Sequence, residues 1–311
     1  MNNQTTAYHM FTEDERFEPM SAVDAALERG ALFEVKTQPL VVDGFTPRIS
    51  KGTYAGEPEH VIFFRELGDE RMVLNIAHPS HPASNYLPVL EQAEALFPNS
   101  VTSLAVLEDG KRLMFEQTID DDTDLGDGGY GTHLLWTASL NGTWPTRAAG
   151  MFERFFCSNQ LPSATTHISV KRTVNHDLLL SLRSQIMAGI GQDRDALHEK
   201  VSSLRAIKIT DAQFRNLVAQ VLPRPEGKDG NEPSTRAMNT WERKVAACSY
   251  FWGEESEGPA AGTAWAAWNA IQSAEAHVFT RGVNQRRDHA DMVTNNRQPV
   301  TELAERVLVA V

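Results

Sequence analysis

The chain has 311 residues, of which 41% are hydrophobic and 23% are charged, and its formal net charge at pH 7 is −12. This composition is typical of a globular protein with one large or two modest domains, and the negative charge excludes a surface that is positive throughout. No apolar run approaches the roughly 18 to 20 residues that cross a bilayer, and the N-terminal residues lack the order of a secretory signal, so we expect a cytoplasmic protein.

The first half of the chain predicts strands with one or two helices. A short helix is expected in residues 20–30, ending at Gly30, and a second in 87–97, capped by Asn85 and stopped by Pro98. Alternating apolar residues and glycine turns predict the strands between and after these helices. Those strands are expected in 31–42, in hairpins over 58–78 and 101–120, on both sides of a turn at Asn141 and Gly142, and in 164–174. A long acidic, glycine-rich loop is expected over 120–131.

The second half predicts helices. They are expected in 175–191, 194–209, 210–222, 235–254, 262–282 and 301–311, with Thr210 as a capping residue. Residues 223–235 are charged and rich in proline and glycine, which is typical of a linker. We therefore predict an α+β protein with a mainly antiparallel curved sheet followed by a helical C-terminal half.

This reading divides the chain into four parts. They are an N-terminal arm and short helix (1–30), an α+β core domain (31–222), the linker (223–235) and a helical C-terminal region that packs on the core (236–311).

Positive charge is concentrated between residues 147 and 183. The basic residues there are Arg147, Arg154, Lys171, Arg172 and Arg183, and only Glu153 and Asp177 oppose them. Several cations on one face would bind phosphates, whereas a solvated surface strand would explain the same residues without a ligand. The local excess points toward an anionic ligand, but a surface strand explains it adequately, and an anion-binding groove that includes Arg147 and Arg154 is the alternative.

The familiar catalytic and metal-binding motifs are absent from the sequence. The spacing of Asp120, Asp122 and Asp124 begins like a calcium loop, but Leu125 and Gly131 stand where its glycine and glutamate belong. Prolines at 79 and 82 exclude a helix around His78 and His81, which favours turn residues over metal ligands. We therefore expect no cofactor and no metal.

Cysteine and aromatic residues favour a packed core. Cys157 and Cys248 lie in apolar surroundings that suit buried free thiols, although Cys157 with His167 could form a nucleophile and base. The aromatic residues of the second half could stack on bases, but their spacing beside alanines favours a core or a subunit interface. These residues are Trp241, Tyr250, Phe251, Trp252, Trp265 and Trp268.

From Ala31 to Val278 the chain resembles the phage- and plasmid-encoded "phage/plasmid-like protein" family, domain of unknown function 932. The segments that carry the resemblance include VLNIAHPSHPASNYLPVLEQAEALF, SLAVLEDGKRLMF, HLLWTASLNGTWPTRAAGMFERFFCSNQL, ISVKRTVNHD and GTAWAAWNAIQSAEAHV. Cys157, Asn159 and Leu161 match one family pattern, and Trp265, Asn269 and Ala270 match another. The chain departs from the family at Leu140–Thr143 and at Lys171–Thr173, where members carry histidines. The resemblance implies a mobile-element origin and the cytoplasm of a host bacterium; it implies no particular activity.

The leading hypothesis is a non-enzymatic protein that binds nucleic acid, most plausibly single-stranded DNA, in recombination, annealing or replication. Arg147, Arg154, Lys171 and Arg172 would neutralise phosphates, and Trp144 would stack on a base. A homo-oligomer would align these basic strips and turn acidic faces outward.

Two other hypotheses stay open. A protein-binding module could sequester or redirect a host factor through its acidic surface and aromatic-rich second half. An enzyme with an unrecognised site could use Cys157, His167, His176 and Asp177.

Overall fold

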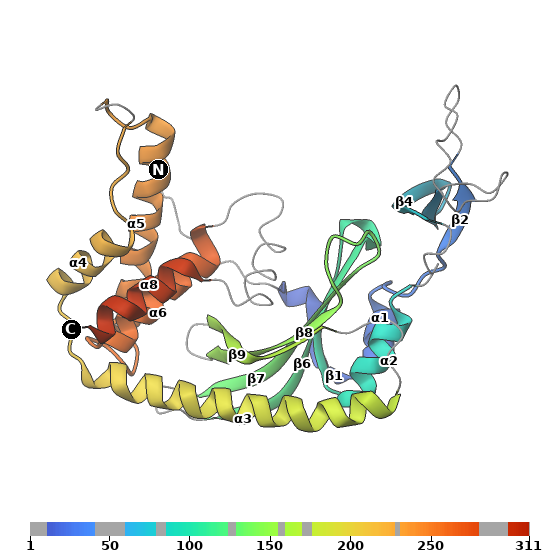
Figure 1. Cartoon of the computed structure of the whole chain (residues 1–311), viewed down its shortest axis with the longest axis horizontal. Coiled ribbons are helices and arrows are strands. Elements are labelled where there is room, and N and C mark those ends of the chain that lie inside the picture. Colours follow the sequence, from blue (N-terminus) through green and yellow to red (C-terminus); the bar gives the residue numbers. More distant parts are fainter. Residues whose placement is uncertain are drawn as a thin grey trace, which may run out of the picture.

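The computed structural model describes residues 11–40, 60–78, 85–123, 129–154, 159–169, 176–227, 231–279 and 298–310. For residues 121–123, 154, 159–169 and 176–182 it describes the backbone and not the side chains. Figure 1 shows a sheet in the middle of the molecule, a long helix along it, a small second sheet at one end and a group of helices at the other.

The main sheet has six antiparallel strands, five of which follow one another along the chain. In spatial order they are β1 (Arg16–Met20), β5 (Val101–Leu107), β6 (Arg112–Thr123), β7 (Tyr130–Ser139), β8 (Arg147–Arg154) and β9 (Asn159–Ser169). The tight connection η2 (Glu108–Gly110) joins β5 to β6, and Gly142, with a φ of 70°, lies in the turn between β7 and β8. The turns predicted at both positions are confirmed.

The main sheet is strongly curved. Arg16 on β1 lies 3.5 Å from Glu153 on β8, although β5, β6 and β7 separate these strands. Four strand spacings of about 4.8 Å make about 19 Å, which an arginine and a glutamate cannot bridge over a flat sheet. The face that carries both side chains is therefore concave.

Helices cover the other face of the sheet. They are α1 (Ala22–Glu28), α2 (Leu87–Leu96) and the 31-residue α3 (His176–Ala206), which runs along the sheet in Figure 1. On β7, Leu134 and Trp136 point into the large core that these helices close. Gln117 on β6 joins sheet to helix, because its side-chain amide donates to the carbonyl oxygens of Ala93 and Phe97.

A small antiparallel sheet stands at one end of the molecule, beyond α1 and α2 (Figure 1). Its strands are β2 (Lys36–Pro39), β3 (Val61–Leu67) and β4 (Glu70–Ala77), in that spatial order. Phe63 and Leu74 attach it to the large core, and Asn75 donates to the carbonyl oxygen of Leu140. The hairpin predicted over 58–78 is confirmed.

The second half of the chain is helical, as predicted. It comprises α4 (Asp211–Val221), α5 (Thr235–Glu255), α6 (Ala264–Ala274), the π-helical turn η4 (Glu275–Phe279) and α8 (Pro299–Val309). These helices gather at the end of α3 away from the small sheet (Figure 1). Every residue of α6 is buried. Among the described residues, no helix is long and apolar enough to cross a membrane.

Two predicted boundaries are wrong. The two helices expected over 175–209 form one continuous helix, α3, despite its two glycines. Buried side chains at Ile186, Ile190, Leu197 and Val201 follow one face through the predicted break, and their packing outweighs a cost of about 1 kcal/mol per glycine. The acidic loop expected from residue 120 begins later, since β6 extends to Thr123. The α+β class itself is confirmed.

Candidate functional site

The structure describes the predicted basic residues only in part. Arg147 begins β8 and is half-buried, with its Cα opposite Thr137 and Ser169. Arg154 ends β8, and its side chain lies outside the described atoms, as do Lys171 and Arg172 entirely. Their convergence on one face stays a prediction.

The prediction that Trp144 stacks on a base is wrong, because the ring of Trp144 is not on the surface. The side chain is 4% exposed and packs with Phe11, Leu135 and Met151 in a small cluster on the concave face. The turn after β7 folds it inward, where its backbone N–H donates to the hydroxyl of Ser139. A base cannot stack on a ring that is covered in this way.

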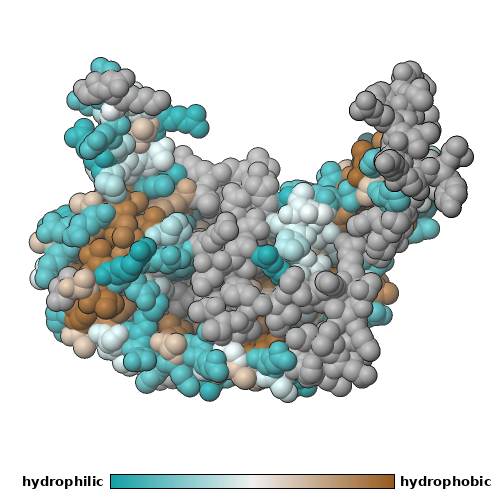
Figure 2. Space-filling view, in the orientation of Figure 1, coloured by the Kyte–Doolittle hydropathy of each residue, from teal (hydrophilic) through white to brown (hydrophobic). Residues whose placement is uncertain are grey.

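A groove lies between the end of α4, the segment after it and the beginning of α5. Its volume is about 500 Å³, and Leu222, Pro225, Arg236, Trp241 and Lys244 are among the residues that line it. A volume of this size suits a small ligand or one unit of a polymer. Figure 2 shows hydrophilic residues over the end of the helical half where α5 begins, and hydrophobic residues gathered below it.

The orientation of Trp241 in this groove is fixed. Its indole N–H donates to the carbonyl oxygen of Leu222 at 2.9 Å, which ties the ring of α5 to the end of α4. The ring is half-buried and lines the groove. A planar group could therefore stack on a ring that has already lost its rotational freedom.

The groove attracts negative charge. Arg236 and Lys244 stand eight residues apart on α5 and so share one face of the helix. Arg236 lies in the first turn of α5, which contains no acidic residue, and the helix dipole adds positive potential there. None of the described residues that line the groove is acidic.

The packing role predicted for the aromatic residues is confirmed for part of the set. Phe251, Trp265 and Trp268 are buried, and the last two stack with ring centroids 5.0 Å apart. Trp241 differs because it lines the groove. The groove lies outside residues 147–183, and its signal in the sequence is the spacing of Arg236, Thr240 and Lys244 on one helix.

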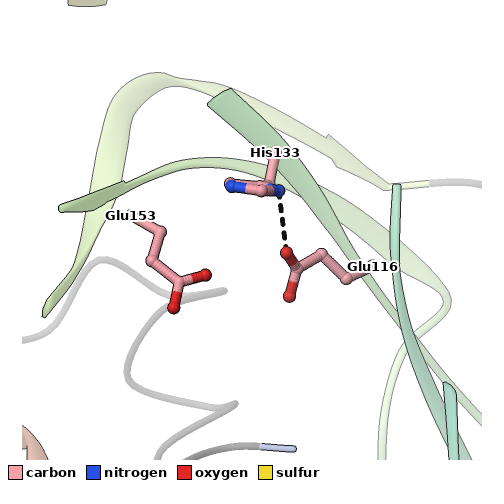
Figure 3. Close-up of side chains that lie close together, drawn as sticks. All are labelled: Glu116, His133 and Glu153. Atoms are coloured by element: carbon pink, nitrogen blue, oxygen red, sulfur yellow. Dashed lines mark ion pairs between the residues drawn. The ribbon is translucent and has the colours of Figure 1, made fainter. Parts of the chain in front are cut away.

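A second candidate site lies on the concave face of the main sheet. Glu116 on β6, His133 on β7 and Glu153 on β8 are all buried, and one ligand atom of each lies within 4.8 Å of the others. Figure 3 shows the two carboxylates and the imidazole gathered together from three neighbouring strands. The expectation of no metal rested on sequence motifs, and these three residues are too far apart in sequence to form one.

Hydrogen bonding within this group is incomplete. His133 Nδ1 lies 2.7 Å from Glu116 Oε1 and 3.2 Å from the hydroxyl of Thr118. Glu153 is held by the guanidinium of Arg16 at 3.5 Å. Two other buried atoms, His133 Nε2 and Glu116 Oε2, have no hydrogen-bond partner within the described part of the chain.

The surroundings change how readily this group holds protons. Burial disfavours the charged form of His133, but the carboxylate of Glu116 outweighs it and the pKa of His133 is raised. Burial, followed by the negative charge of Glu116, raises the pKa of the Glu153 carboxyl. Both groups therefore hold protons at a pH where the same groups in water would release them.

The structure does not test whether the thiol, the two histidines and the aspartate proposed for an enzyme lie close together. Cys157 lies outside the described residues. For His167 in β9, and for His176 and Asp177 at the start of α3, the structure describes the backbone alone. Their proximity stays a prediction.

Comparison with known proteins identifies one family. The model of a domain of unknown function (DUF932) matches residues 87–299, from α2 to the first residue of α8. The match includes the strands of the buried group and both helices of the groove. No curated protein and no solved structure gave a match. Since the family model covers more than half of the chain, the protein belongs to the DUF932 family.

Proposed function

We propose that this protein binds single-stranded nucleic acid and that the groove beside α5 contacts one nucleotide of the strand. Trp241 would stack on the base, while Arg236 and Lys244 would bind the flanking phosphates. The observation that carries the proposal is the combination of an oriented indole and two cations in a groove whose described lining has no carboxylate.

Charge is the main physical obstacle to this function. A chain with a net charge of −12 repels nucleic acid at long range, so contact depends on local positive surface. The groove provides such a surface at one end of the molecule. Assembly into a homo-oligomer would place several grooves along one strand and let their weak contacts add.

The residues first proposed for DNA binding remain part of the proposal. Arg147, Arg154, Lys171 and Arg172 would extend the phosphate contacts along the sheet, and Trp241 replaces Trp144 as the stacking residue. A curved antiparallel sheet with a long helix behind it is also the arrangement expected by analogy with single-strand annealing proteins, an analogy of fold alone.

The biological setting belongs to the same proposal. The resemblance to phage- and plasmid-encoded proteins supports a mobile-element origin and a role in recombination, annealing or replication in the host cytoplasm. A non-enzymatic role follows from this reading, since stacking and phosphate contacts require no catalytic group.

Fluorescence anisotropy with a labelled single-stranded oligonucleotide tests the function. Binding should weaken steeply with salt, and the double variant Arg236→Ala/Lys244→Ala should flatten the salt slope by about 0.7 for each lost phosphate contact. Trp241→Ala should cost about 1–3 kcal/mol of binding free energy with little change in that slope.

Two comparison variants make the test specific. Arg194→Ala/Lys208→Ala removes two exposed cations elsewhere and changes the net charge equally, so its binding should equal the wild type. Lys171→Ala/Arg172→Ala tests the sheet. If only the sheet variant weakens binding, the protein binds nucleic acid but the groove is the wrong site. If the wild-type chain shows no salt-dependent binding, the function is wrong.

A protein-binding role is the second candidate, and one observation favours it. On one face of the small sheet, Val73 and Ile76 of β4, opposite Phe64 and Ile62 of β3, are 44% and 50% exposed, which is unusual for neighbouring large apolar residues. Such a surface suits contact with a host protein. Val73→Ser/Ile76→Ser should abolish that contact without affecting nucleic-acid binding, and an unchanged interaction would exclude this surface.

A further inference from the structure

The buried group on the concave face calls for an explanation that nucleic-acid binding does not provide. Glu116 is 3% exposed, and His133 and Glu153 are each 7% exposed. Removing carboxylates from water is costly unless other groups take over the lost hydrogen bonds. Arg16 supplies one partner for Glu153, but its side chain is 41% exposed and lies 3.5 Å away, so it compensates only in part.

One carboxylate oxygen in the group is available to a ligand. Glu116 Oε2 is buried and has no hydrogen-bond partner among the residues that the structure describes. Buried polar atoms in folded proteins are normally paired, so this unpaired oxygen beside a second buried carboxylate points to a cation. In Figure 3 the carboxylates of Glu116 and Glu153 approach each other beside the imidazole, so the three side chains face a common space.

The orientation of the imidazole suits a metal ligand. Its Nδ1 lies 2.7 Å from Glu116 Oε1, close to the separation of two ligand atoms bound to one ion. Without its proton, Nδ1 would therefore share an ion with that carboxylate oxygen.

The spacing also suits a metal ion. Two ligands bound to one ion at about 2.1 Å lie about 3–4 Å apart. The ligand atoms of the three residues all lie within 4.8 Å of one another, so a small rotation of the carboxylates closes the site. A divalent ion would also balance the charges of Glu116 and Glu153.

We propose that Glu116, His133 and Glu153 bind one first-row divalent metal ion on the concave face of the sheet. One imidazole and two carboxylates favour Mn²⁺, Fe²⁺ or Zn²⁺ over Mg²⁺ and Ca²⁺, which prefer oxygen ligands alone. The ion would tie β6, β7 and β8 together at the centre of the sheet. The inference is independent of the nucleic-acid proposal, because it involves different residues on a different part of the fold.

Calorimetric titration of the EDTA-treated full chain with Mn²⁺, Zn²⁺ and Mg²⁺ tests the site. We expect one Mn²⁺ or Zn²⁺ ion per chain and much weaker binding of Mg²⁺. Glu153→Gln and His133→Gln keep the side-chain volume close to that of the wild type and should each lower the affinity at least about 10-fold. Glu305→Gln, which changes a half-exposed carboxylate paired with Lys200, should bind the ion as the wild type does.

The absence of stoichiometric binding, or binding that neither variant weakens, would overturn the proposal; protons alone would then neutralise the group. A spectroscopic measurement on the wild-type chain guards against variants that fail to fold. Pulsed electron paramagnetic resonance of the Mn²⁺ complex should show coupling to one imidazole nitrogen. A spectrum without that coupling excludes His133 as a ligand and overturns the proposed site.

Discussion

The concave face of the sheet and the groove beside α5 are two sites built in opposite ways. On the sheet, three strands each contribute one side chain. Because these side chains are buried together, the protonation and position of each depend on the other two. In the groove, one helix supplies the indole ring of Trp241 and both cations, and solvent reaches them. A change in the sheet should therefore alter folding and ligand affinity together, whereas a change in the groove should alter ligand affinity alone.

The largest expected effect is on the free energy of unfolding, when a tryptophan is replaced by alanine in each of the two regions. Trp136 is fully buried, stacks on Phe115 with centroids 5.6 Å apart and donates its indole N–H to Gln117 at 2.7 Å. Trp136→Ala should lower the free energy of unfolding by about 3–5 kcal/mol, because it removes core volume and leaves a buried amide unpaired. Trp241→Ala should lower it by about 1 kcal/mol, since its ring is half-buried.

Urea denaturation followed by circular dichroism measures both values. The Trp136 variant should retain nucleic-acid affinity as long as it is folded, and the Trp241 variant should lose about 1–3 kcal/mol of binding free energy. Equal losses of stability in the two variants would contradict the distinction between a cooperative sheet and an independent groove.

The same distinction explains what the sequence could predict. Helix α4 with its cap at Thr210, the hairpin β3–β4 and the turn at Gly142 each depend on neighbouring residues, and their local patterns predicted them correctly. Local apolar periodicity also predicted the α+β class. These features require no knowledge of strand order.

The buried group was beyond such reasoning, because strand pairing brings it together. Glu116 lies opposite Leu135 on β7, and His133 lies opposite Met151 on β8, so two register relations place the three side chains on one face. A signal was present in the sequence, since Glu116 and Glu153 each follow a run of apolar residues and His133 precedes one. The prediction for Trp144 was wrong although its turn was predicted correctly. The direction in which the turn points the ring depends on the hydrogen bond to Ser139, which the local pattern does not reveal.

The next expected effect is a pH dependence confined to the sheet. The pKa of Glu153 is raised above its usual 4.5 and that of His133 above its usual 6.5. In each case the folded chain holds a proton that the unfolded chain has released, so the free energy of unfolding should fall as pH rises above these usual values. Glu153→Gln removes one of the two groups and should make the decline shallower.

Denaturation of the EDTA-treated chain over a pH series measures this slope. Trp241→Ala serves as the matched control and should decline as steeply as the wild type, because the groove contains neither group. A Glu153→Gln slope identical to that of the wild type would show that the carboxyl holds no extra proton.

A smaller effect is expected at Arg16. Its substitution should strengthen metal binding, whereas substitution of a proposed ligand should weaken it. Its guanidinium lies 3.5 Å from Glu153 and competes with a metal ion for that carboxylate. A divalent and a univalent charge about 6 Å apart repel each other by about 1.4 kcal/mol even in water, which corresponds to about 10-fold in affinity. Arg16→Gln should therefore bind Mn²⁺ up to about 10-fold more tightly in calorimetry at low salt. Weaker binding would mean that Arg16 supports the site instead of opposing it.

The smallest expected effect is the absence of a reaction at Cys248, on the same helix as the groove. Cys248 is fully buried, and burial, followed by the charge of Glu275, raises its pKa to about 12. The thiol should stay protonated and shielded, although Lys244 lines the open groove one turn earlier. In a Cys157→Ser variant, iodoacetamide at pH 8 should leave the folded chain unlabelled and label it fully in urea. Labelling of the folded chain would mean that α5 separates from α6 on the timescale of the reaction, and a helix that opens in this way could not hold Trp241 ready for a ligand.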